Sequence, residues 1–205
     1  RELGLLEKHL PKEGDYKNVK YDIQWKNFTS GAPLTSEMVA DRLDIGVMAE
    51  FPAVNNLVAF QEAGKASIFL APLSGSITGS GNAIVVPNQS HVTSFAELKG
   101  KTISVPFAST AHGLLLRAVK AQGWEPNKDV QIIAQAPEVA GPALKSNKID
   151  AHADFVPFGE LFAYQGVAKK IYDGSQAKGA TFHGVLANQQ YAEQHPEVIK
   201  AYLKA

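Results

Sequence analysis

The sequence predicts an α/β protein built from two related lobes, and two observations carry that prediction. Apolar segments of strand length alternate with amphipathic segments of helix length along most of the chain. A short pattern also recurs, because residues 38–52 and 143–157 each pass from a helix through an Asp into an apolar strand, an acidic residue and a Pro. Alternating strands and helices favour mainly parallel sheets covered by helices, in which ligands bind beyond the carboxyl ends of the strands.

The individual elements follow from periodicity and from helix-ending residues. An early helix is expected to end near Gly14, while Pro33 and Pro52 suit the first turns of two further helices. Glycines then end several of the expected helices. Strands are expected at residues 19–25, 43–48, 66–73, 101–106, 129–135, 149–155, 168–173 and 181–188, with one more ending at Pro87. Helices are expected at residues 33–42, 51–64, 94–100, 109–123, 137–147, 157–166 and 189–205.

Composition excludes several classes of function. The 205 residues carry 20 Lys and Arg against 20 Asp and Glu, and this balance argues against nucleic acid as the main partner. The chain has no Cys, which rules out disulfides, zinc–thiolate sites and thiol nucleophiles. No apolar run approaches the roughly 18 residues of a membrane-spanning helix. Both ends fall inside amphipathic runs, so we expect an incomplete chain, an internal portion of a longer one with any signal peptide upstream.

The first candidate site lies where a strand passes into a helix at Ser109, Thr110 and Ala111. A helix N-terminus offers free N–H groups to an anion, hydroxyls add donors, and alanine permits close approach. The alternative is that the hydroxyls only cap the helix. A second loop of the same kind contains Ser30 and Gly31, where the alternative is an ordinary strand-to-helix turn.

Two acidic residues, each followed by Phe, mark the ends of two expected strands. These pairs are Glu50–Phe51 and Asp154–Phe155. Carboxylates at such positions would favour a cation, and the alternative is that they are surface groups capping the next helix. No phosphate-binding loop, nucleophile elbow or His-x-x-x-His metal motif is present. We therefore expect no catalytic residue, metal or cofactor.

Several segments together resemble a known family. Residues 28–52, 81–87, 95–123, 143–158 and 191–205 are similar to the periplasmic substrate-binding proteins of ABC importers of the nitrate/sulfonate/taurine (NitT/TauT) class. The resemblance implies a type II periplasmic-binding-protein fold, in which ligand is trapped between two hinged α/β lobes. Residues 1–83 and 184–205 would form lobe one and residues 84–183 lobe two, with hinge crossings near 81–85 and 183–186.

The resemblance also implies a function. The protein would capture a small polar ligand without chemistry and deliver it to a membrane permease, as a periplasmic or membrane-anchored extracytoplasmic monomer. Matching positions assign the ligand to Ser30, Gly31, Ser109, Thr110 and the Asp154–Phe155 pair. Two carboxylates near the cleft argue against a simple sulfonate or nitrate; a zwitterion such as an aminosulfonate would fit, and so would a neutral or cationic nitrogen compound. The alternatives are a pyrimidine-precursor enzyme of the same fold, whose cysteine and histidine motifs this chain lacks, and a ligand-sensing regulatory domain.

Overall fold

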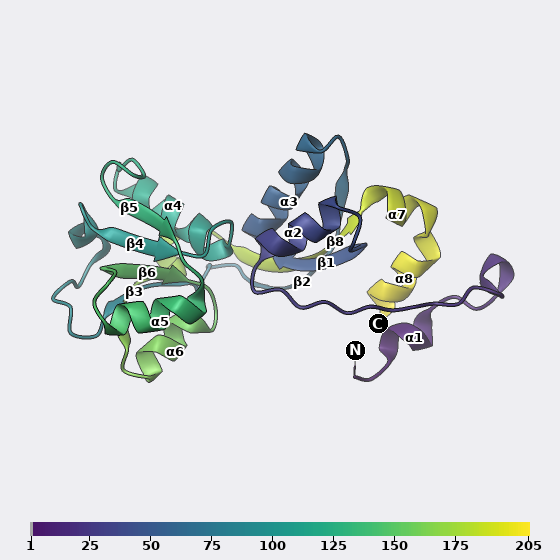
Figure 1. The fold of residues 1–205 in the computed structure, drawn as a ribbon, viewed down its shortest axis with the longest axis horizontal. Helices are drawn as coiled ribbons and strands as arrows, with labels where there is room; N and C mark the ends of the chain where they lie inside the picture. Colours follow the sequence, from purple (N-terminus) through teal and green to yellow (C-terminus); the bar gives the residue numbers. More distant parts are fainter. Residues whose placement is uncertain (1) are drawn as a thin grey trace.

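A computed structural model describes residues 2–205, which form two lobes, each around its own β-sheet (Figure 1). We call residues 2–76 and 181–205 lobe one, and residues 83–177 lobe two. Strand β3 begins at Ala83 and strand β8 at Thr181. The expected boundaries at 83/84 and 183/184 therefore fall just inside these two strands.

Lobe one contains a three-stranded sheet in the order β1-β8-β2, with β8 antiparallel to both neighbours. Its strands are β1 (Ile45–Ala49), β2 (Ser67–Ser76) and β8 (Thr181–Asn188). Its helices are α1 (Leu5–His9), α2 (Gly31–Val39), α3 (Glu50–Glu62), α7 (Gln189–Gln194) and α8 (Pro196–Lys204), with a 3-10 turn η1 (Gly14–Tyr16). Met38, Phe60 and Leu186 join α2, α3 and the sheet in one buried cluster, and Ala187 and Ile199 join the sheet to α8 in another.

Lobe two contains a five-stranded sheet in the order β5-β4-β6-β3-β7. Its strands are β3 (Ala83–Pro87), β4 (Thr102–Val105), β5 (Gln131–Ala134), β6 (Ala151–Asp154) and β7 (Ala168–Asp173). Its helical elements are η2 (Phe95–Leu98), α4 (Thr110–Ala121), α5 (Pro137–Lys145), α6 (Phe158–Tyr164) and η3 (Gly174–Ala177). Side chains of β3 alternate, so that Ile84 packs in the α4 cluster and Val85 in the cluster that contains residues of α5 and α6.

Two sequence-based predictions about the sheets are wrong. Residues 19–25 form no strand but an extended segment, because their alternating pattern meets no strand partner in the described chain. The sheets are also not mainly parallel, since only β4 pairs in parallel, with β5 and β6. Strands β3 and β8, which carry the chain into and out of lobe two, run antiparallel to their neighbours.

Two short connections join the lobes, at residues 77–82 and 178–180. They touch, because a Cβ on Gly79 would collide with the carbonyl oxygen of Gly179. Gly79 also has a φ of 77°, which favours glycine. The expected crossing at 183–186 is misplaced, because these residues pair inside the sheet of lobe one.

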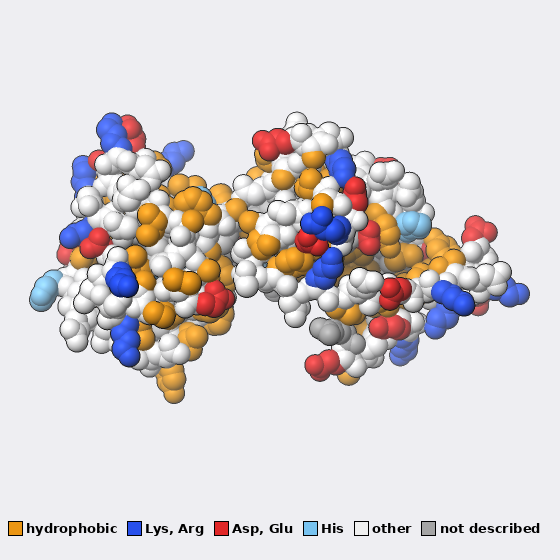
Figure 2. Space-filling view, viewed as in Figure 1, with side chains coloured by type: hydrophobic (Ala, Val, Ile, Leu, Met, Phe, Trp, Pro, Cys, Tyr) orange, Lys and Arg blue, Asp and Glu red, His pale blue; other side chains and the backbone are white. Residues whose placement is uncertain are grey.

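The surface reflects the two-lobed architecture. Figure 2 shows a narrow waist between the lobes and charges of both signs spread over each of them. Within residues 2–205, none of the helices has both the length and the apolar character needed to cross a bilayer.

Candidate functional site

A cavity of about 720 Å³ opens between the two lobes and continues along the edge of lobe one. We call the part lined from both lobes the cleft; its polar lining residues include Ser30, Glu50, Ser80, Asn82, Ser109, Thr110, Thr181 and His183. The remainder is a groove between the extended segment 21–28, strand β1 and helix α8. Helices α2, α3 and α4 all begin at the cleft, so their N-terminal ends and free N–H groups face one volume.

The two hydroxyls at the start of α4 have different partners. The Ser109 Oγ accepts a hydrogen bond of 3.2 Å from the backbone N–H of His112, which makes Ser109 the N-cap. The Thr110 hydroxyl instead donates to the Glu50 carboxylate across the cleft, with an O···O distance of 2.6 Å. Capping and a contact across the lobes therefore occur at adjacent residues.

Glu50 is the centre of a small interlobe network. Its Oε1 accepts from Thr110, and its Oε2 lies 3.4 Å from the backbone N–H of Phe182 in β8. The Asn82 Nδ2, in the first connection, lies 3.4 Å from the Thr110 Oγ1. Residues from both lobes and from one connection thus meet around one carboxylate.

Ser30 and Gly31 lie at the start of α2 and line the cleft. Ser30 is the N-cap by position, but its side chain makes no capping hydrogen bond, so the hydroxyl has no helix partner. A Cβ on Gly31 would collide with the Pro52 ring. Close packing of α2 against α3 therefore explains the glycine, whether or not a ligand approaches it.

Phe51 joins the lobes through an apolar contact. Its ring packs on α4, where a Cβ added to Gly113 would stand 2.7 Å from the Phe51 Cδ2. The ring also meets the His112 ring edge-on, with centroids 5.9 Å apart. Burial lowers the pKa of His112, which favours a neutral imidazole. Phe51 is absent from the described lining of the cavity and contacts lobe two directly.

Asp154 is fully buried inside lobe two and does not line the cleft. Its carboxylate accepts from the Phe155 N–H at 2.8 Å and bonds the His152 Nε2 at 2.8 Å. The His152 Nδ1 lies 2.8 Å from the Ser104 hydroxyl, which completes a buried chain of three side chains. Burial raises the pKa of Asp154, although the hydrogen bond from His152 opposes the rise.

The two remaining residues expected from the sequence also differ in whether they line the cleft. Phe155 lines the cleft, whereas Ala111 is fully buried in the core beneath α4. Sequence reasoning missed Ser80, Asn82, Val156, Thr181 and His183, which also line it. Most of these residues lie in or beside the two connections between the lobes. Placing those connections correctly in the sequence would have identified them.

Comparison with known proteins identifies the family. The model of the NMT1-like family matches residues 10–205, nearly the whole sequence. The chain belongs to the NMT1-like family. Its fold is the type II periplasmic-binding fold expected from the sequence, as the structures of relatives confirm.

Several proteins named for the ligands that they bind are similar to this NMT1-like chain. The taurine-binding periplasmic protein of Escherichia coli is 30% identical over 186 residues, which cover 89% of this chain and 55% of that protein. The alkanesulfonate-binding protein SsuA of Xanthomonas axonopodis pv. citri, solved with bound MOPS, has a TM-score of 0.77 at 25% identity, covering 99% of this chain and 65% of that one. The aliphatic sulphonate-binding protein SsuA of E. coli has a TM-score of 0.74 at 26% identity, covering 98% and 64%. The chain therefore spans somewhat over half the length of these relatives.

Proposed function

We propose that this chain is the ligand-capturing part of a solute-binding protein that serves an ABC importer. The observation that carries the proposal is the cleft, which takes its lining from both lobes and from the starts of three helices. A molecule held there contacts both lobes at once, so binding favours their closed arrangement. The relatives named as taurine- and sulfonate-binding proteins support the same function.

The residues we assign to the ligand are those that sequence and cavity have in common. These are Ser30, Gly31, Glu50, Ser109, Thr110 and Phe155. Three other residues expected from the sequence lie behind this surface. The Phe51 ring packs between the lobes, and Ala111 lies in the core of lobe two. The Asp154 carboxylate accepts a hydrogen bond from the Phe155 N–H. Closure around a ligand removes water, which strengthens each hydrogen bond to it.

Capture without chemistry is favoured over an enzymatic function. Ser104, His152 and Asp154 form a Ser–His–Asp chain, which is the arrangement of a hydrolase triad. All three side chains are fully buried, so the Ser104 hydroxyl cannot reach a substrate in the cleft. We further propose that the whole protein acts in the periplasm, or tethered outside the cytoplasmic membrane, and delivers its ligand to a permease.

Thermal or chemical unfolding of the purified protein with candidate ligands tests the function. The panel contains taurine, alkanesulfonates, nitrate, bicarbonate and small amines. A ligand present at a hundred times its dissociation constant stabilises the folded state by about 2.7 kcal/mol. A double variant, Ser109→Ala with Thr110→Ala, should lose that stabilisation while it still folds. Failure of every compound to stabilise the protein contradicts ligand capture.

A further inference from the structure

Glu50 places a carboxylate where an anionic ligand group would otherwise bind. Its Oε1 accepts from the Thr110 hydroxyl at 2.6 Å, at the N-terminal end of α4. Such an end attracts negative charge, because its N–H groups have no partners within the helix. The protein's own carboxylate therefore already occupies the cleft side of this helix start.

This carboxylate retains capacity for a further donor. An ionised carboxylate offers about four lone-pair positions. Oε1 has one short hydrogen bond, and Oε2 has one long contact, 3.4 Å from the Phe182 N–H. Glu50 also lines the cavity, so the unused positions are available to a bound molecule.

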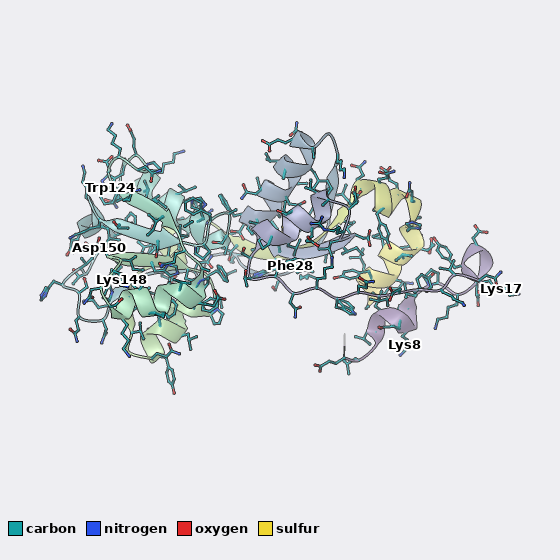
Figure 3. All side chains as sticks on the ribbon, in the orientation of Figure 1. Lys8, Lys17, Phe28, Trp124, Lys148 and Asp150 are labelled. Atoms are coloured by element: carbon teal, nitrogen blue, oxygen red, sulfur yellow. The ribbon has the colours of Figure 1, made fainter. Side chains whose placement is uncertain are left out.

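No Lys or Arg side chain balances Glu50 among the described residues that line the cleft. Lys26 lines the groove, but its Nζ bonds Glu37 at 2.9 Å and the Arg42 carbonyl at 3.1 Å, near the far end of α2. Figure 3 places Lys8, Lys17 and Lys148 well away from the junction of the lobes. Among the described residues that line the cleft, Glu50 therefore has no basic partner; Arg117 lies against Gly179 in the second connection but is not one of these lining residues.

We propose that the cleft selects ligands that carry an ammonium group, and that Glu50 is the residue that recognises it. This inference rests on the proposed function and names the class of ligand. A purely anionic ligand would meet the like charge of Glu50 in the cleft, and this repulsion grows as closure of the lobes removes water. A cationic N–H donor gains a charge-assisted hydrogen bond at the same point. The Ser30 hydroxyl makes no capping hydrogen bond, so it can bind the other polar group of the ligand.

Matched pairs of small molecules test this selection by calorimetry on the purified protein. Taurine and 2-hydroxyethanesulfonate differ only in an ammonium against a hydroxyl, and ethanolamine and ethylene glycol form a second pair without the sulfonate. We expect the ammonium member of a pair to bind roughly 10- to 100-fold more tightly, as for a hydrogen bond between charged groups. Glu50→Gln should reduce that preference to about threefold or less, because the amide is neutral and keeps the shape.

Glu62→Gln provides the matched control, since Glu62 lies exposed at the other end of the same helix and its replacement changes the net charge equally. Glu62→Gln should leave the affinities for both members of each pair unchanged. If 2-hydroxyethanesulfonate binds as tightly as taurine, the inference is overturned and ligand capture stands. An equal effect of Glu50→Gln on all probes also overturns it, because Glu50 would then only hold the lobes together. If none of the four probes binds, the inference is overturned; ligand capture itself falls only if the whole ligand panel fails as well.

Discussion

Gly113 allows Phe51 of lobe one to rest on helix α4 of lobe two, and Gly113→Ala measures that contact. A Cβ at this position would stand 2.7 Å from the Phe51 Cδ2 and 2.9 Å from its Cγ. Carbon atoms in contact normally lie about 3.5 to 4.0 Å apart, so the ring must retreat by about 1 Å. Overpacking of this kind costs about 1 to 3 kcal/mol.

The backbone of α4 gains from the same substitution. Alanine is favoured over glycine inside a helix by about 1 kcal/mol, and Gly113 has no positive φ that would prevent the exchange. With Phe51 present, Gly113→Ala should therefore leave the free energy of unfolding unchanged or lower it by up to about 2 kcal/mol. In a Phe51→Ala background the clash is absent, and Gly113→Ala should raise the free energy of unfolding by about 1 kcal/mol.

Urea unfolding followed by circular dichroism, on the unsubstituted protein, the two single variants and the double variant, gives the coupling energy directly. We expect a coupling of about 1 to 3 kcal/mol between positions 51 and 113. If Gly113→Ala stabilises the protein equally in both backgrounds, the ring of Phe51 does not rest on α4 in solution and the reasoning is refuted.

Three further predictions concern single positions. Ser109→Ala removes the N-cap of α4 and should lower the free energy of unfolding by about 1 kcal/mol in urea titrations. Gly31→Ala forces a methyl group onto the Pro52 ring and should cost about 1 to 3 kcal/mol, with a shift in the unfolding midpoint but not in its slope. Hydrogen bonds from Arg42, chiefly, hold the pKa of Glu37 at about 2, so its stabilising effect is full above the ordinary pKa and disappears as the pH falls through about 2. Glu37→Gln should thus destabilise the protein at pH 7 and change little near pH 2; equal effects at both values contradict the ion pair.

The parts of the fold that depend on local pattern are predictable from the sequence. The helix at 109–123 and its Ser109 cap are confirmed as α4, because periodicity and N-capping operate within a few residues. The segment 19–25 shows the limit of the same reasoning. Alternation fixes which side chains share a face of a strand, but a strand also needs a partner, which the segment's own residues do not specify.

The candidate site is harder to predict because its contacts join distant parts of the chain. Thr110 and Glu50 are 60 residues apart, and Phe182 is 132 residues from Glu50. Asp154 and Glu50 follow similar local patterns, yet only Glu50 reaches the cleft. The difference arises at His152, whose ring bonds the Asp154 carboxylate inside lobe two. The pattern shared by residues 38–52 and 143–157 does not indicate that hydrogen bond.

Strand β8 lies in the middle of the sheet of lobe one, although it follows the whole of lobe two in the chain. Until residues 181–188 have been synthesised, β1 and β2 lack the strand that lies between them, whereas the five described strands of lobe two have all been made. Lobe two can therefore mature first as the chain emerges, and lobe one remains open until its central strand arrives. The order of synthesis thus leaves β1 and β2 without the strand that pairs with both of them until the chain has passed through lobe two.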